Sequence, residues 1–269
     1  MQRDESDLLP IWLRYHAALA SYGSITLLDN GSTDPACLRT LAEAEALGVR
    51  VIREHTGPQS FAAKGDLVAA LIRRLTPAPD VVVPLDVDEF LALRQGEDYS
   101  CDPAAIQTWM AQLPPGSAFH SAQRLNNCPW EARTYFPMPP DRSPKLLFST
   151  TDVWGLDLGF HRCDQPTPAR PADWVLFHYH NKPYPLLRHH ALRKLLPRLP
   201  LPSSRQLEHY QGPGDHLLPC LLQGERSWLQ QLRRQPSCYT AALVERFHQL
   251  QLPLPFAGDH PRAQALLSP

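Results

Sequence analysis

The chain has 269 residues, of which 43% are hydrophobic and 20% are charged, a composition typical of a soluble globular protein with one sizeable core. Its net charge is -1 and its pI is about 6.9, so the overall charge offers no basic field for a polyanion and we expect no nucleic-acid partner. The six cysteines include no Cys-x-x-Cys pair, which argues against a zinc cluster and against a disulfide-stapled fold.

The sequence also bears on the relation of the chain to membranes. No run reaches the roughly 18 apolar residues of a membrane span, and the acidic residues at the start of the chain are unlike a signal peptide. We therefore expect a cytoplasmic protein without a transmembrane segment, while peripheral membrane association stays open.

The first part of the chain alternates between helical and strand patterns. Apolar residues at helical spacing predict a helix over residues 6 to 20, and a short apolar strand is expected over Ser24 to Leu28. Turn-forming residues follow from Asp29 to Asp34, after which Pro35 opens the next helix and Gly48 closes it. Further elements are expected at 49–53 (strand), 61–75 (helix) and 81–85 (strand). This order predicts an α/β fold with an open, mostly parallel (mixed) sheet flanked by helices.

The strand expected at 81–85 carries the strongest functional signal. It is a β-branched apolar run that continues into Asp86-Val87-Asp88-Glu89-Phe90. Two carboxylates at the carboxyl end of a buried strand are hard oxygen ligands, which suit a divalent cation and a phosphate group. Asp29 lies at a similar strand end, so we expect both acidic sites to lie at the same edge of the sheet.

The second part of the chain is rich in proline and aromatic residues. We expect a helix at 104–113, strands at 118–124, 145–149 and 174–179, and helices at 186–196, 224–234 and 239–251. The chain is accordingly divided into a main domain, residues 1–183, and a helical, proline-rich extension, residues 184–269, packed on the same domain.

Four motifs in this order resemble one family of enzymes. They are Arg3-Asp4-Glu5, Leu28-Asp29-Asn30-Gly31-Ser32-Thr33-Asp34, Leu85-Asp86-Val87-Asp88-Glu89-Phe90-Leu91 and Phe177-His178-Tyr179-His180-Asn181-Lys182. Together they resemble the glycosyltransferase family 2-like and family 92 group. The resemblance implies a GT-A fold, a nucleotide-diphosphate sugar donor, with UDP-sugar the first choice, and a glycan or lipid-linked acceptor. It also implies Mn²⁺ or Mg²⁺ as cofactor and inversion at the anomeric carbon.

The resemblance implies roles for individual residues as well. Metal ligation is expected of Asp86, Asp88 and His178, and contacts with the sugar nucleotide are expected of Glu5, Asp29, Asp86 and Lys182. Inversion by direct displacement needs a general base, for which Asp157 and Glu131 are the candidates. The family's first strand would precede Arg3, where this sequence has only Met1 and Gln2, so that strand is expected to be missing.

Simpler roles are open for several of these residues. Asp34 just before Pro35 is a good helix N-cap, which we favour over binding. Lys64 and Lys145 are further candidates for phosphate contacts, but Lys64 lies on an amphipathic helix where a solvated side chain is the common outcome. Two other functions also remain: a catalytically silent protein that binds sugar nucleotides or glycans, and, with less support, a metallohydrolase.

Overall fold

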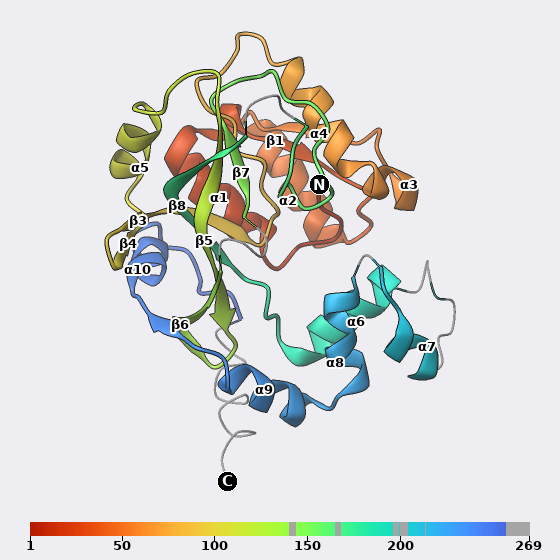
Figure 1. Ribbon diagram of the computed structural model, residues 1–269. Helices are drawn as coiled ribbons and strands as arrows, with labels where there is room; N and C mark the ends of the chain where they lie inside the picture. Colours follow the sequence, from red (N-terminus) through yellow and green to blue (C-terminus); the bar gives the residue numbers. More distant parts are fainter. Residues whose placement is uncertain (140–143, 165–167, 196–198, 200–203, 213, 257–269) are drawn as a thin grey trace. The chain divides into compact units, whose positions relative to one another are not determined.

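The structure is a computed structural model, which describes residues 1–139, 144–164, 168–195, 199, 204–212 and 214–256 (Figure 1). The chain divides into two compact units. The first unit comprises Met1–Leu125, Pro137–His178 and Thr240–Pro255, and the second comprises Asn126–Phe136, Tyr179–Tyr239 and Phe256–Pro269. Each unit therefore joins segments that are distant in sequence, whereas the sequence analysis places a single boundary after residue 183.

The first unit contains most of the predicted alternation of helices and strands. Its helices are α1 (Leu9–Ala20), α2 (Pro35–Ala46), α3 (Gly57–Ala62), α4 (Lys64–Arg73), α5 (Pro103–Met110) and α10 (Ala242–Gln249). Its strands are β1 (Thr26–Leu28), β2 (Arg50–Ile52), β3 (Glu89–Gln95), β4 (Asp98–Ser100), β7 (Leu146–Phe148), β8 (Arg170–His178) and most of β5 (Ala118–Cys128).

Local sequence explains where two of these helices begin. The side chain of Asp34 accepts a hydrogen bond from the backbone N–H of Ala36 at the start of α2, which confirms the predicted N-cap. The side chain of Asp102 accepts one from the N–H of Ala105 at the start of α5. In both helices the residue after the cap is proline, whose fixed φ suits the first helical position.

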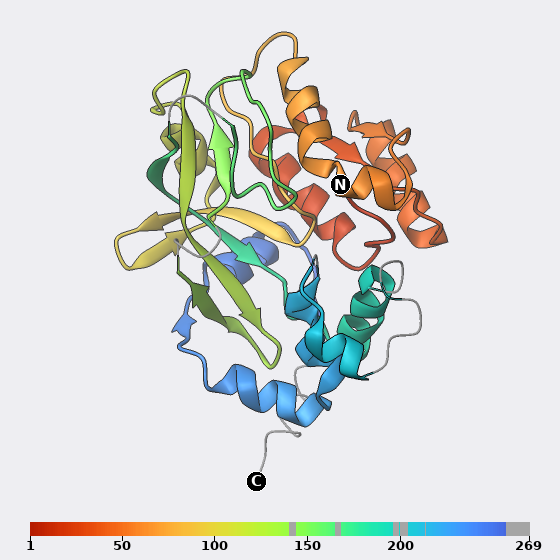
Figure 2. The same cartoon turned by 45° about the vertical axis from the view of Figure 1, so that its right-hand side comes forward.

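The strands form two sheets of different type. Strands β1 and β2 make a two-stranded parallel sheet, with Leu27 opposite Val51. The larger sheet has the order β4-β3-β8-β5-β6-β9, and β7 also pairs with β5; its curvature is visible in Figure 2. The pairs β3–β4, β3–β8, β5–β7 and β6–β9 are antiparallel. The fold is thus α/β with mixed strand pairing: β1 and β2 are parallel, whereas these four pairs of the larger sheet are antiparallel.

One residue occupies the edge of β1 opposite β2. The N–H of Gln2 donates to the carbonyl of Leu28 (2.9 Å), and the carbonyl of Gln2 accepts from the N–H of Asn30 (2.8 Å). These bonds make an isolated parallel bridge between Gln2 and Asp29. The first unit therefore has a one-residue bridge where the family resemblance implies a first strand.

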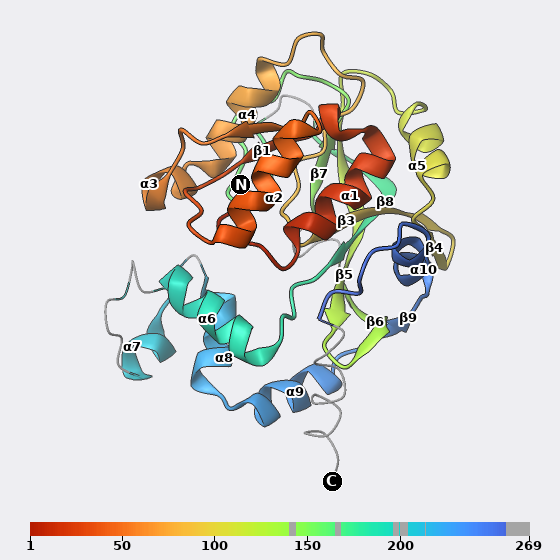
Figure 3. The same cartoon turned by 180° about the vertical axis from the view of Figure 1, so that it is seen from behind.

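The sheet of the first unit is covered on both faces. One face of β5 and β7 contributes Phe119 and Leu147 to a core that also contains Leu19 of α1 and Ile106 of α5. The opposite face contributes Ala118, Leu146 and Phe148 to a core with Ile72 of α4 and the segment Val153–Phe160. Figure 3 shows α1 lying beside α2, and α1 also contacts α5 and β3. Burial on both faces explains why β7 is a continuous apolar run, Leu146-Leu147-Phe148.

Two predicted elements differ from those observed. The expected strand at 81–85 makes only one bridge, from Val82 to Phe148, and the regular strand β3 begins later, at Glu89. The run has high strand propensity, but propensity becomes a strand only where partners are available. The expected helix at 61–75 is divided into α3 and α4, which meet at Ala63.

The second unit is mainly helical. It contains β6 (Glu131–Met138, in part), α6 (Tyr184–Leu195), α7 (Ser204–His209), a 3₁₀ turn (Asp215–Leu217), α8 (Leu218–Leu222), α9 (Glu225–Arg233) and β9 (Cys238–Tyr239). Its core joins Leu187 and Ala191 of α6 to Trp228 and Leu232 of α9. Buried Asn127 and Asn181 also pair through side chain and backbone, with three hydrogen bonds of 2.7–3.0 Å.

Across the described part of both units, every helix is too short or too polar to cross a bilayer.

Candidate functional site

The two motif carboxylates Asp86 and Asp88 lie in a tight turn, and β3 begins directly after it. The N–H of Glu89 donates to the carbonyl of Asp86 (3.1 Å), and the N–H of Asp86 donates to Oε2 of Glu89 (2.9 Å). These reciprocal bonds fix residues 86–89 as a closed turn. The predicted strand end is therefore wrong, although the motif is still presented by an extended apolar segment.

Two lysines from different parts of the first unit hold Asp86. Lys64 Nζ donates to Oδ1 of Asp86 (2.8 Å), and Lys145 Nζ donates to Oδ2 (3.0 Å). Lys145 also pairs with Oε2 of Glu89 (3.0 Å). The side chains of Lys64, Lys145 and Glu89 are 5%, 1% and 1% exposed, and that of Asp86 is 30% exposed. The Lys145–Glu89 pair is therefore shielded from water, whereas Asp86 is partly open to solvent. We call Lys64, Asp86, Glu89 and Lys145 the ion network.

The pKa values in the ion network follow from this arrangement. Burial raises the pKa of Asp86, but Lys145 and Lys64 together lower it further, to well below its usual value. Burial lowers the pKa of Lys145, and the carboxylates of Asp86 and Glu89 more than reverse that effect and raise it. Both groups are therefore charged at neutral pH, as a stable buried pair requires.

An aromatic ring lies beneath the two lysine ammonium groups. The Nζ atoms of Lys64 and Lys145 are 4.4 and 5.2 Å from the centre of the Phe160 ring, within the range of cation–π attraction. Phe160 has a left-handed backbone, with φ of 58°, and its carbonyl accepts from the N–H of Leu146 (3.0 Å). The loop is tied at Asp157, whose Oδ1 accepts from the backbone N–H groups of His161 and Arg162.

The packing of α4 against this loop positions Lys64. A Cβ atom on Gly65 would lie 1.8 Å from the carbonyl oxygen of Leu156 and 2.8 Å from that of Asp157. Only glycine therefore permits α4 to approach the loop this closely. The approach brings Lys64 within reach of both Asp86 and Phe160.

The second motif carboxylate, Asp88, lies beside His178. Strand β8 ends at His178, which is opposite Glu89 in the antiparallel pairing with β3. His178 Nε2 is 3.4 Å from Oδ2 of Asp88. The carboxylate of the turn before β3 and the imidazole at the end of β8 thus converge at the start of β3.

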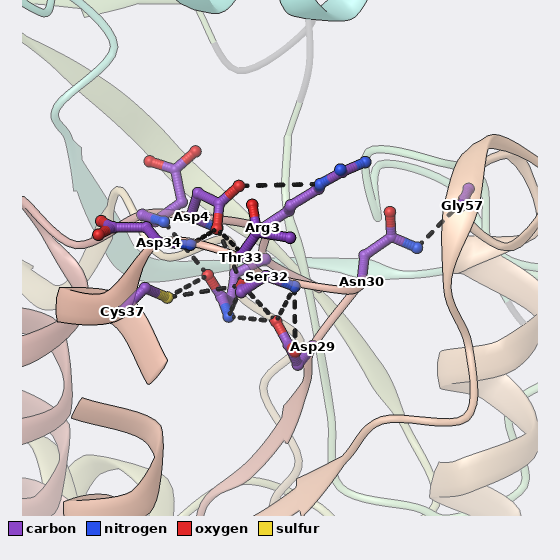
Figure 4. Close-up of polar contacts among 11 residues, drawn as sticks. Arg3, Asp4, Asp29, Asn30, Ser32, Thr33, Asp34, Cys37 and Gly57 are labelled. Atoms are coloured by element: carbon purple, nitrogen blue, oxygen red, sulfur yellow. Dashed lines mark hydrogen bonds and ion pairs between the residues drawn. The ribbon is translucent and has the colours of Figure 1, made fainter. Parts of the chain in front are cut away.

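A second polar cluster lies at the end of β1, where Asp29 is 3% exposed (Figure 4). Its Oδ1 accepts hydrogen bonds from the side chains of Gln2 (2.7 Å) and Ser32 (2.5 Å). Oδ1 of Asp4 accepts from the N–H groups of Thr33 (2.6 Å) and Asp34 (2.8 Å). The first and second sequence motifs are therefore joined, with Asp4 capping the loop that follows β1.

The first two residues link this cluster to the ion network. Met1 lies within electrostatic range of Lys64, Asp86, Lys145 and Glu89. The next residue, Gln2, contacts Asp29. The acidic groups predicted from two separate strand ends therefore belong to one region of the first unit.

The remaining predicted site residues have local structural contacts. Glu5 begins the turn into α1, where its carbonyl accepts from the N–H groups of Leu8 and Leu9. Oε1 of Glu131 accepts from the N–H of its neighbour Arg133, within the second unit. Lys182 is buried in the second unit. Nucleotide contacts of Glu5, Asp29 and Lys182, and the base role of Asp157 or Glu131, remain predictions.

A divalent cation fits the donors Asp88 and His178. The described residues contain no group of three or more His, Cys, Asp and Glu side chains arranged to hold a metal. The separation of 3.4 Å between Nε2 and Oδ2 is nevertheless one that two ligands of a single ion adopt when each lies about 2.1 Å from it. Asp86 differs, because each of its two oxygens accepts from a lysine. The donors would thus be Asp88 and His178, with phosphate oxygens and water completing the shell.

Sequence reasoning underestimated Lys64, Lys145 and Phe160. The solvated reading of Lys64 is wrong, since the residue is 4% exposed. Its partner lies 22 residues away, and that of Lys145 lies 59 residues away. The available signal was the position of Lys145 at the start of a predicted apolar strand, where a lysine is out of place unless it is paired.

Comparisons with protein-family models, with curated proteins and with solved structures gave no match to this chain.

Proposed function

We propose that the chain is a metal-dependent glycosyltransferase of GT-A type that transfers a sugar from a nucleotide diphosphate to a hydroxyl of a glycan or lipid-linked acceptor. The observation that carries this proposal is the Asp86–Glu89 turn, in which two buried lysines hold Asp86 while Asp88 lies beside His178. The four motifs of the family resemblance add support, since each of them supplies residues to this region of the first unit.

The charges of the site suit a diphosphate leaving group. Lys64 and Lys145 provide two cations against the carboxylates of Asp86 and Glu89, so the ion network carries no net negative charge of its own to repel a phosphate. A cation held by Asp88 and His178 would supply Lewis-acid stabilisation of the negative charge on the departing diphosphate. The ion network would keep the turn rigid, so that Asp88 does not have to be ordered when donor binds.

The transfer itself is a displacement at the anomeric carbon. The acceptor hydroxyl oxygen forms the new glycosidic bond, the bond from that carbon to the phosphate oxygen breaks, and the hydroxyl proton passes to a general base. Asp157 and Glu131 remain the candidates for this base. Oδ1 of Asp157 is occupied by backbone N–H groups, so a role as base would fall to its other oxygen.

Thermal unfolding in the presence of nucleotides tests the proposal. We expect UDP or another nucleoside diphosphate to raise the Tm of the wild type in the presence of Mn²⁺, and the Mn²⁺-dependent part of this shift to disappear in Asp88→Asn and His178→Ala. Asp98→Asn is the matched control, because Asp98 is exposed on β4, and it should behave as wild type. If no nucleoside diphosphate raises the Tm, or if Asp88→Asn responds as the control does, the site assignment is wrong.

Turnover separates the remaining alternatives. A transferase releases the nucleoside diphosphate from its sugar donor, and faster when acceptor is present. Stabilisation by nucleotide and Mn²⁺ without any donor turnover would indicate the silent binding protein. Hydrolysis of phosphate esters without a sugar donor would indicate the metallohydrolase.

A further inference from the structure

The near-neutral charge of the whole chain conceals a strong difference between its two units. The first unit contains 15 Lys and Arg and 22 Asp and Glu, a net charge of -7, while the second contains 11 Lys and Arg and 5 Asp and Glu, a net charge of +6. The expectation that this protein has no basic field was drawn from the sum of the two, and it does not hold for the second unit.

The basic residues of the second unit are concentrated around α6. Residues 179–207 contain six Lys and Arg and three His, with no Asp or Glu. Helix α6 lies within this stretch and carries Arg188, His189 and Arg193 as exposed side chains. The helix itself and its neighbours in sequence contain no carboxylate.

The outer surface of α6 also carries leucines that its core does not use. Leu187 and Ala191 are buried in the core of the second unit, at 5% and 0% exposure. Leu186 and Leu192 are both 37% exposed, on the same helix as the exposed arginines. Leu187 and Ala191 already attach the helix to the core of the second unit, so the exposed leucines beside them are not needed for that packing.

Helix α9 of the same unit shows what an ordinary surface helix looks like here. Its apolar residues Trp228, Leu229 and Leu232 are all buried, and its exposed positions are polar, as at Arg226, Gln230 and Arg233. Basic charge by itself is therefore common to both helices. The combination of basic side chains with exposed leucines distinguishes α6.

We propose that α6 binds the surface of an anionic lipid bilayer, with Arg188 and Arg193 on the headgroups and Leu186 and Leu192 in the interfacial region. Interfacial helices combine basic and apolar side chains in this way, whereas a binder of a polyanion needs only the basic ones. This inference rests on the charge and exposure of the second unit and not on the proposed transferase activity, so either can fail without the other. It would place the protein close to a lipid-linked acceptor.

Co-sedimentation of the full chain with vesicles tests the inference. We expect the wild type to sediment with vesicles of phosphatidylcholine and phosphatidylglycerol at 3:1, but not with phosphatidylcholine alone, and to dissociate in 0.5 M NaCl. Because each basic side chain near such a surface contributes roughly a fivefold change in binding, Arg188→Glu/Arg193→Glu should weaken it by roughly 25-fold or more. Leu186→Ser/Leu192→Ser should weaken it too, by roughly fivefold or more.

Matched controls come from the first unit. Arg39→Glu/Arg74→Glu makes the same change of charge at exposed arginines, and Leu38→Ser/Leu47→Ser removes leucines that are 41% and 57% exposed. Both controls should bind as wild type. The inference is wrong if the wild type ignores anionic vesicles, if the controls lose as much binding as the α6 variants, or if the leucine variant binds unchanged. If the leucine variant binds vesicles unchanged and also binds heparin as the wild type does, α6 recognises polyanions.

Discussion

Lys145 shows how strongly a single buried charge depends on its partners. Its side chain is 1% exposed and lies 3.0 Å from carboxylates of both Asp86 and Glu89. A lysine in such surroundings would be strongly unfavourable without these carboxylates. Glu89 depends on Lys145 in turn, whereas Asp86 is also paired with Lys64.

Replacing Lys145 should therefore destabilise the protein severely. We expect Lys145→Met to lower the free energy of unfolding by about 3–5 kcal/mol, because it leaves Glu89 buried without its cation. Urea denaturation followed by circular dichroism measures this change. Arg53→Met is the control, since Arg53 pairs with Glu45 at the surface and its loss should cost less than about 1 kcal/mol. Equal losses in the two variants would contradict the role assigned to Lys145.

His16 makes the stability of the protein depend on pH. The ring is 6% exposed, and its pKa falls from 6.5 to about 4, because burial disfavours the charged form more than the carbonyl of Trp12 favours it. The unfolded chain therefore binds a proton at higher pH than the folded protein does. The contribution of neutral His16 to the free energy of unfolding is fully present above pH 6.5. It is lost as the pH falls towards 4, by about 3 kcal/mol in total.

Removing the ring should remove this part of the pH dependence. We expect His16→Leu to lose less stability between pH 6.5 and pH 4 than the wild type does, and the exposed control His248→Gln to follow the wild type. Some slope will remain, because burial and the nearby Lys145 also lower the pKa of His161, to about 4. Urea unfolding at several pH values measures the slopes, and identical slopes in the His16 variant and the wild type would refute the assignment.

At the scale of elements, the contact between α4 and the loop at Leu156 determines where Lys64 lies. Alanine usually stabilises a helix relative to glycine, by about 1 kcal/mol. At Gly65 the added methyl group would overlap the carbonyl of Leu156, at 1.8 Å. Steric overlap at this distance outweighs the helix propensity and pushes α4 away from the loop.

Gly65→Ala should thus destabilise the protein, although helix propensity alone predicts that alanine stabilises α4. We expect a loss of about 1–3 kcal/mol in the free energy of unfolding, typical of an overpacked site, together with a weaker response to nucleotide and Mn²⁺. Gly23→Ala is the control, because nothing lies within 4 Å of a Cβ atom added there. A stabilised Gly65→Ala would show that the two segments separate without cost.

The helices were more predictable than the strands. The N-cap and proline at Asp34-Pro35 and the apolar spacing of α6, α9 and α10 lie within the helix itself, so the expected segments overlap those observed. The sequence analysis did not separate strand β3 from the apolar run before it. The two segments differ in that β3 pairs with β4 and β8, and its partners in β8 lie more than 75 residues further along the chain.

At the scale of the whole molecule, the cysteines agree with a chain that needs no disulfide. All six lie outside any disulfide bond, and Cys37, Cys101, Cys128 and Cys220 are buried. Burial raises the pKa of each of these four thiols, to about 12 for Cys101 and to about 11 for Cys128 and Cys220. Thiols that are buried and protonated react slowly.

Thiol titration should reflect this burial. We expect at most the two half-buried thiols, Cys163 and Cys238, to react with Ellman's reagent in the folded protein, and all six to react after denaturation in guanidinium chloride. Rapid reaction of more than two thiols without denaturant would show that the cores of the units are more open than the structure describes.

The sequence by itself determined the class of the fold, most helix positions and the carboxylates that define the candidate site. These features depend on residues close together in the chain: the spacing of apolar side chains, the capping pairs and the Asp86-Val87-Asp88-Glu89 motif. Only the tertiary structure decided that Asp86 is held by Lys64 and Lys145, that Asp88 meets His178 and that Asp4 caps the loop after β1. Burial and pairing join residues 22 to 90 positions apart, and no local pattern records which of many charged side chains will be enclosed together.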